Sequence, residues 1–363
     1  MEAAERIEAA AKRIFPGCET VRFPIADGGE GTVEALVNAT GGELRTVRVT
    51  RSMGDAVTAS YGVIHGDTAV IEMAQANGLT LTPQKERDLL RAGSRGTGEM
   101  IREALDAGYR KLIIAVGGSG TNDGGIGAMA ALGVDFLDRK GRVLGASGRD
   151  LGEIADICTD RLHPALAEAR LTVMCDVDNP LVGPSGATYV YGPQKGGDRE
   201  CLDILEAGMK NYADVVERKT GISLHDMPGA GAAGGISGAL AALAGAELKS
   251  GISVVLEAYG FEESLRDADL VVTGEGRLDS QSVRGKVLCG IGEACKRHGV
   301  PAAALVGGIG PGGRAIYEAG IQSVMVIVDG VMELSEAVRD AGPLLEDAAE
   351  RMFRMIRIGK ALG

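Results

Sequence analysis

The chain has 363 residues, with 50 acidic and 38 basic side chains and a formal net charge of −12. This length exceeds the size at which a single hydrophobic core usually stops growing, so two domains are expected. So acidic a chain offers no basic surface for a nucleic-acid backbone or an anionic membrane, which argues against both as partners.

The cysteines and the amino terminus predict a cytoplasmic protein. Six cysteines are scattered without a Cys-x-x-Cys pair, which favours reduced thiols over a disulfide framework or a zinc site. The first residues include Glu2, Glu5 and Glu8, where a signal peptide would carry positive charge. No apolar run reaches the roughly 18 residues of a membrane-spanning helix.

The first hundred residues predict an α/β start followed by a meander. A helix over Ala3–Phe15 ends at Pro16, a strand follows over Val21–Ala26, and a second helix covers Glu34–Ala39. Three strand-like segments come next, with spacing too short for βαβ units. They are Leu44–Val49, Ala56–Ile64 and Ala69–Glu72.

The middle of the chain predicts two strands and two helices. Ser94 is a candidate N-cap for a helix that runs to Ala107, and strands follow at Lys111–Val116 and Leu171–Cys175. Apolar residues then recur every three or four positions from Leu202 to Val216, as on the buried face of a long helix. Asp198 precedes this helix and Gly221 ends it.

The last third alternates strand and helix, which is typical of a doubly wound parallel sheet. The predicted segments are strand Leu270–Thr273, helix Val283–Arg297, strand Ala302–Val306, helix Gly313–Ala319, strand Ser323–Val328 and helix Leu344–Ile358. Because the first forty or so residues share this rhythm, we predict one discontinuous domain over 1–43 and 266–363, with a second α/β domain inserted over 44–265.

Several predicted strands run into loops of glycine and carboxylates. In open α/β sheets, ligands collect beyond the carboxyl ends of the strands, so we expect the function to lie in these loops. The loops are Asp27–Thr32, Gly117–Gly125, Asp176–Pro180 and Gly274–Ser282.

Taken together, six runs resemble the bacterial glycerate kinases that lack a Walker loop. They are Pro24–Thr32, Gly117–Gly125, Cys175–Leu181, Gly192–Gly196, Pro228–Gly235 and Thr273–Lys286. The resemblance implies phosphorylation of D-glycerate with ATP and Mg²⁺, in a flavodoxin-like domain interrupted by a second α/β domain. It also implies one departure, since the family starts with a further strand and an Asp-Ser-Phe-Lys-Gly loop. We expect the lysine of that loop to contact substrate or phosphate, so that either translation starts upstream or this form is impaired.

Phosphoryl transfer requires backbone amides, one or two cations and hard carboxylate oxygens, and the loops supply all three. The predicted catalytic residues are Asp27, Asp176, Lys195, Glu275, Asp279 and Lys286. The predicted nucleotide-binding residues are Ser119, Gly120, Thr121, Asn122, Asp123, Gly124 and Gln281. Asp176 and Asp279 are the candidate Mg²⁺ ligands, and the identity of the base stays open.

Two other motifs do not predict a binding site. The run Gly229–Gly234 fits the dinucleotide fingerprint, but no strand precedes it, so NAD binding is not expected. Gly285-Lys286 lacks the spacing of a Walker loop.

Three questions stay open from the sequence. A magnesium-dependent phosphohydrolase and a non-catalytic protein that binds a small hydroxy acid are the alternatives to a kinase. The phosphorylated hydroxyl is not readable from the residues. The oligomeric state is also open, with a homodimer among the options.

Overall fold

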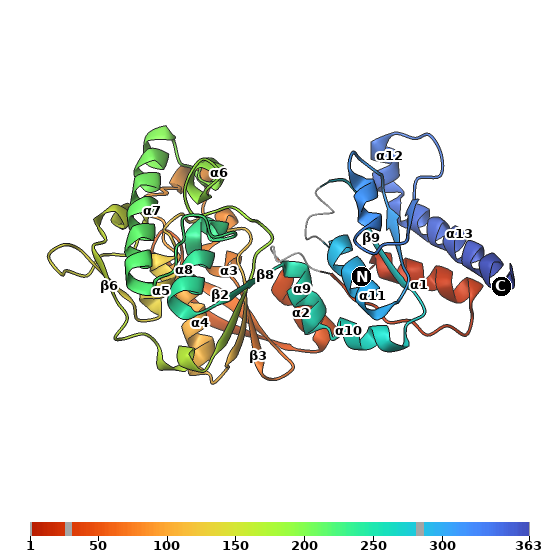
Figure 1. Ribbon diagram of the computed structural model, residues 1–363, viewed down its shortest axis with the longest axis horizontal. Helices are drawn as coiled ribbons and strands as arrows, with labels where there is room; N and C mark the ends of the chain where they lie inside the picture. The colour runs from red at the N-terminus through yellow and green to blue at the C-terminus, as the bar shows by residue number, and fades with distance from the viewer. Residues whose placement is uncertain (1, 26–30, 281–286, 363) are drawn as a thin grey trace. The chain divides into compact units, whose positions relative to one another are not determined.

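The structure is a computed structural model that describes residues 2–25, 31–280 and 287–362. It divides into two compact units (Figure 1): unit 1 comprises Met1–Asp27 and Ile252–Gly363, and unit 2 comprises Gly28–Gly251. These bounds differ from the predicted ones, which placed residues 1–43 and 266–363 together.

Helix packing explains why α2 belongs to unit 2 and why α9 lies mostly in unit 1. Helix α2 (Thr32–Thr40) covers strand β2 (Ala56–Ile64) so closely that a Cβ on Gly62 would lie 2.6 Å from Val37 Cγ2, and α2 therefore belongs to unit 2. Helix α9 (Gly251–Ala258) places its apolar residues in a core of unit 1.

Unit 2 is a mixed α/β unit. Its helices and strands are α2 (Thr32–Thr40), β1 (Glu43–Thr50), β2 (Ala56–Ile64), β3 (Thr68–Glu72), α3 (Ala74–Asn77), α4 (Arg95–Asp106), β4 (Lys111–Ala115), α5 (Ile126–Ala131), β5 (Asp135–Leu137), β6 (Asp156–Cys158), β7 (Arg170–Met174), α6 (Ala187–Tyr191), α7 (Arg199–Thr220), α8 (Ile236–Ala244) and β8 (Glu247–Lys249). Short 3-10 helices connect them: η1 (Leu79–Leu81), η2 (Gln84–Glu86), η3 (Gly148–Glu153), η4 (Pro164–Ala167), η5 (Pro193–Lys195) and η6 (Ala232–Gly235).

The main sheet of unit 2 has the strand order β1-β2-β3-β4-β7-β8. The first three strands pair antiparallel, which confirms the predicted meander, and β3, β4, β7 and β8 pair in parallel. The last residues of these four strands lie in one row across the sheet: Glu72, Ala115, Met174 and Lys249. The loops that follow them therefore start at the same edge.

Helix α7 matches its predicted pattern. Leu202, Leu205, Met209, Tyr212 and Val216 are all buried in the core of unit 2. At its start, the Asp198 carboxylate accepts a hydrogen bond from the amide of Cys201, and at its end Gly221 adopts φ 76°. Residues at that φ are most often glycine, because a Cβ is strained there.

Unit 1 is built on a parallel sheet of three described strands in the order β11-β10-β9. Its elements are α1 (Glu2–Ile14), α9 (Gly251–Ala258, which begins at the last residue of unit 2), α10 (Phe261–Ser264), η7 (Leu265–Asp267), β9 (Val271–Glu275), α11 (Val287–His298), β10 (Ala302–Val306), η8 (Gly313–Tyr317), β11 (Ser323–Val326), α12 (Leu334–Arg339) and α13 (Ala341–Leu362).

Helices cover both faces of this sheet. Ala302, Ala304 and Val306 of β10 pack into a core with α11, whereas Ala303 and Leu305 pack into a core with α1 and α13. Helices α1 and α13 lie side by side (Figure 1). This arrangement confirms the predicted α/β class with a parallel sheet.

Two predicted elements of unit 1 take other forms. Val21–Ile25 is irregular and not a strand: Phe23 packs on the rings of Tyr259 and Phe261, and Tyr259 Oη donates to Pro24 O at 2.6 Å. Proline also removes one donor that a strand would use.

The second is the helix predicted over Gly313–Ala319, which is the 3-10 helix η8. Its first residue follows Pro311 and Gly312, and glycine and proline both disfavour an α-helix.

No helix within the described ranges is long and apolar enough to cross a membrane.

Candidate active site

Three glycine-rich segments of unit 2 meet beyond the carboxyl edge of the main sheet. The amide of Gly124 donates to Gly234 O at 2.9 Å, and the amide of Gly231 donates to Asn179 O at 3.0 Å. A Cβ on Gly231 would lie 2.2 Å from Pro180 O, so only glycine allows this approach. We call the three segments, residues 117–125, 179–196 and 228–235, the glycine-loop cluster. The dinucleotide-like glycines of 229–234 therefore serve the packing of these loops.

Lys195 connects segment 179–196 to segment 117–125 by hydrogen bonds. Its side chain is buried, with 2% of the residue exposed, and Nζ lies 2.9 Å from Ser119 Oγ and 2.6 Å from Thr121 O. Burial lowers the pKa of Lys195 to about 7, and the nearby Asp123 carboxylate opposes that shift. A neutral amine keeps two N–H donors, so both contacts survive deprotonation.

A small cavity of about 10 Å³ lies beside Lys195. This is room for about one water molecule. The hydroxyls of Ser52 and Thr82 line it and have no hydrogen-bond partner within the described part of the chain. A nucleotide or glycerate cannot enter so small a space. In this structure the Lys195 amine is therefore engaged by groups of the protein itself.

The lowered pKa of Lys195 predicts a pH dependence of stability. Between pH 7 and about 10.5, unfolded Lys195 binds a proton that the native side chain lacks, so the free energy of unfolding should rise with pH. The slope approaches about 1.4 kcal/mol per pH unit for one proton. Denaturant titrations at several pH values should show this rise in the native chain and not in Lys195→Met. Parallel curves for the two proteins would contradict a buried lysine of low pKa.

Asp123 is fully buried and its carboxylate is occupied by protein donors. Oδ2 accepts from Ser94 N and Ser94 Oγ, each at 2.7 Å, and from Gly127 N at 3.1 Å, while Oδ1 accepts from Gly125 N at 3.3 Å. Burial raises the pKa of Asp123, and the hydrogen bonds from Ser94 oppose that rise. Asp123 thus ties the start of α4 to the start of α5.

The other loop groups also point into the protein. Asn122 is buried and its Nδ2 donates to Thr188 Oγ1 at 3.0 Å. The amide of Gly120 donates to Asn77 O at 2.8 Å, and that of Gly124 to Gly234 O. The expected row of amides open to an anion therefore does not include Gly120 or Gly124.

Asp176 is the predicted site residue of unit 2 that is exposed. It lies two residues after the end of β7, and its Oδ1 accepts from the amide of Gly251, the first residue of α9, at 2.8 Å. Nearby, Asn179 Oδ1 accepts from Tyr191 Oη at 2.6 Å. A carboxylate at this edge suits Mg²⁺, which in phosphotransferases is held by one or two carboxylates together with substrate phosphates.

Sequence reasoning missed some residues of this edge. Buried Glu72 ends β3 and accepts from the amides of Gly31, at 3.1 Å, and Val33, at 3.4 Å, at the start of α2. The sequence feature that could have identified Glu72 is a carboxylate directly after the apolar run Ala69–Ile71. No sequence pattern indicated Thr188, which accepts the hydrogen bond from Asn122.

In unit 1, the loops after β9 and β10 pair with each other. The amide of Leu278 donates to Gly308 O at 2.9 Å, and the amide of Gly310 donates to Leu278 O at 2.7 Å. Glu275 ends β9, and Asp279 lies in the first of these loops with its Oδ2 3.8 Å from Arg277 Nε. The glycine-rich loop after β10 was missed, although its glycines directly follow a predicted strand.

The predicted site residues are divided between the units. Lys195, Asp176 and the 119–124 loop belong to unit 2, and Glu275 and Asp279 belong to unit 1. Asp27, Gln281 and Lys286 lie outside the described residues. Within the ranges that the structure describes, no three His, Cys, Asp or Glu side chains form a cluster that could hold a metal ion by themselves.

Residues 1–357 match the sequence profile of the glycerate kinase family. The chain belongs to this family. It is 46% identical to the glycerate kinase of Bacillus subtilis (strain 168), over 100% of this chain and 95% of that protein. It is 43% identical to the glycerate 2-kinase of Escherichia coli (strain K12), over 99% and 94%.

A solved structure agrees with these relatives. A crystal structure assigned to glycerate kinase 2 of Salmonella typhimurium LT2 superposes with a TM-score of 0.86 at 40% identity, covering 99% of this chain and 95% of that one. The predicted family, the α/β fold and a kinase that phosphorylates glycerate are thereby confirmed, and a kinase of this family takes its phosphate from ATP.

Proposed function

We propose that this chain transfers the γ-phosphate of ATP to D-glycerate in the cytoplasm, with Mg²⁺ as the metal. Family membership over residues 1–357 supports the reaction. The observation that carries the location is the glycine-loop cluster at the carboxyl edge of the parallel strands, where open α/β sheets bind ligands.

The residues of unit 2 divide into two roles. Asp176 would ligate Mg²⁺, since its carboxylate is exposed at the end of β7. Bound Mg²⁺ would neutralise charge on the transferring phosphate. Lys195 and Asp123 are positioning residues, because both are buried and bonded within the protein. Exposed groups of the 117–120 segment remain candidates for phosphate contact.

The residues of unit 1 keep the roles that the sequence suggests for them. Glu275 and Asp279 would accept the alcohol proton or ligate the metal, and Gln281 would contact the nucleotide. Asp27 would act with the carboxylates, and Lys286 would neutralise a phosphate or the carboxylate of glycerate. In phosphoryl transfer such groups align the acceptor and stabilise charge, with little covalent chemistry.

An assay of the purified chain with ATP, Mg²⁺ and D-glycerate tests the proposal. The Escherichia coli relative is named a glycerate 2-kinase, so we expect 2-phosphoglycerate as product. Enolase alone should then convert the product to phosphoenolpyruvate, detected by its ultraviolet absorbance. A product that enolase accepts only after a phosphoglycerate mutase is added would be 3-phosphoglycerate. The control is a chain extended upstream; if neither form consumes ATP with glycerate, the kinase proposal fails.

The same assay discriminates the alternatives. A magnesium-dependent phosphohydrolase would release inorganic phosphate without any acceptor alcohol. A non-catalytic hydroxy-acid binder would bind glycerate tightly with no ATP turnover. The phosphohydrolase alternative rests on the acid-rich strand ends alone, whereas the family assignment favours the kinase over both alternatives.

A further inference from the structure

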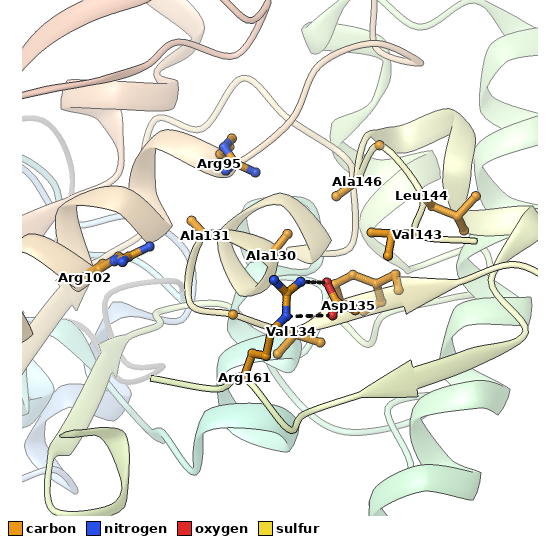
Figure 2. Close-up of a pocket in the computed structure, with 13 residues that line it drawn as sticks. Arg95, Arg102, Ala130, Ala131, Val134, Asp135, Val143, Leu144, Ala146 and Arg161 are labelled. Atoms are coloured by element: carbon orange, nitrogen blue, oxygen red, sulfur yellow. Dashed lines mark hydrogen bonds and ion pairs between the residues drawn. The ribbon is translucent and has the colours of Figure 1, made fainter. Parts of the chain in front are cut away.

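A cleft lined by three arginines lies on unit 2 (Figure 2), and its lining includes no residue of the glycine-loop cluster. Its volume is about 480 Å³, within the range of small-molecule sites. Arg95 and Arg102 come from α4, and Arg161 comes from the loop after β6. The three side chains surround the α5 residues Ala130 and Ala131 (Figure 2). We propose that this cleft binds a small organic acid with two or more phosphate or carboxylate groups, as an effector of the kinase.

Charge points to an anionic ligand. The lining holds three arginines and a single carboxylate, Asp135, in a chain whose net charge is −12. Arg161 donates to both carboxylate oxygens of Asp135, from Nε to Oδ2 at 3.0 Å and from Nη2 to Oδ1. The side chains of Arg95 and Arg102 are 53% and 60% exposed. Among the described residues they form ion pairs with carboxylates of their own helix, Glu99 at 3.1 Å and Asp106 at 3.6 Å. Such exposed pairs are weak, so a multivalent anion can compete for the guanidinium groups.

The remaining lining points to a ligand with a carbon skeleton. The residues that line the cleft between the arginines include Ala130, Ala131, Val134, Phe136 and Val143. Ala131, Val134 and Phe136 are buried, Ala130 is half-buried, and Val143 is 61% exposed. An inorganic ion would leave the exposed side chain of Val143 uncovered. An organic acid would cover it while its charged groups reach the arginines, as in other pockets that combine an apolar lining with a few placed polar groups.

The cleft is connected to the candidate active site through one residue. Arg95 is the first residue of α4 and adjoins Ser94, whose amide and hydroxyl both donate to Asp123. Ser94 Oγ also accepts from the amide of Ala128 in α5, at 3.0 Å, two residues before Ala130 of the cleft. A ligand that shifts Arg95 or α5 therefore acts on the hydrogen bonds that hold Asp123. This regulatory part of the inference rests on the proposed function, whereas binding does not.

Isothermal titration calorimetry without ATP or Mg²⁺ tests the binding. The probes are citrate, for polycarboxylates, and 3-phosphoglycerate, for phosphorylated acids, and at least one should bind saturably. Arg102→Gln and Arg161→Gln should each weaken binding about tenfold, the loss of one charge-assisted contact. Asp135→Asn should instead tighten it several-fold, because it releases Arg161 and removes the opposing charge. Arg199→Gln is the matched control: Arg199 pairs with Asp203 at 3.0 Å outside the cleft, and its loss should leave binding unchanged.

The opposite signs separate a binding role from a structural one. If the pair only stabilised the fold, Arg161→Gln and Asp135→Asn would both lower the melting temperature and neither would tighten binding. Absence of saturable binding by both probes, or dissociation constants that stay within twofold in both arginine variants, would overturn the site.

Kinetics test the regulatory part. With the probe saturating and free Mg²⁺ held constant, KM or kcat for glycerate should change at least twofold in the native chain and not in Arg102→Gln, whose activity without the probe should be normal. Binding without any kinetic change would overturn the coupling to Asp123. A chain that binds the probe at these arginines but phosphorylates nothing would refute the proposed function and leave the site intact.

Discussion

Replacing Lys195 by methionine is expected to lower kcat/KM for glycerate phosphorylation by about a hundredfold or more while the fold persists. The change removes both hydrogen bonds from Nζ and leaves Ser119 Oγ and Thr121 O without their donor. Each unpaired buried group costs about 1–3 kcal/mol, and about 1.4 kcal/mol changes a rate tenfold. We expect the loop to relieve this cost by moving, which misplaces the groups that contact phosphate.

The melting temperature should change little, because methionine also removes the cost of burying an ammonium group. Steady-state kinetics and a thermal melt of the same preparation measure the two effects. Lys219→Met, on an exposed position near the end of α7, is the control and should behave as the native chain. Native-like kinetics in Lys195→Met would show that the loop holds its position without the lysine.

Replacing Gly234 by alanine is expected to destabilise unit 2 by about 3 kcal/mol or more and to abolish activity. Gly234 has φ +72°, and a Cβ there would lie 2.2 Å from Thr121 O. Its carbonyl also accepts the hydrogen bond from the Gly124 amide, so the backbone cannot move without losing that contact. Urea denaturation and the glycerate assay measure the loss.

Gly245→Ala separates the clash from backbone strain. Gly245 ends α8 at φ +68°, and a Cβ there would meet no atom within 4 Å. Its alanine variant carries only the left-handed strain, about 1–2 kcal/mol. If both variants lost the same free energy of unfolding, the clash between a Cβ at position 234 and Thr121 O would contribute nothing to the destabilisation.

Local patterns located most elements because the chemistry that fixes them is local. Helix α7 could be predicted from the apolar spacing from Leu202 to Val216, with Asp198 before it and Gly221 after it. The apolar run Ala302–Val306 sufficed for β10. Ser94 shows the limit: it does stand at the N-cap of α4, yet its hydroxyl bonds Asp123 and the amide of Ala128, partners that no local pattern contains.

The family, the α/β class and the segments that carry glycine and carboxylates could be predicted from the residues, because periodicity and motif identity are properties of neighbouring residues. The surroundings of each polar group could not, because they depend on how distant segments pack. Lys195 and Asp123 look like ligand contacts in the sequence, but packing of residues 117–125 against 179–196 and 228–235 buries both and fills their hydrogen bonds. Burial depends on which distant segments meet, so no local pattern reveals it.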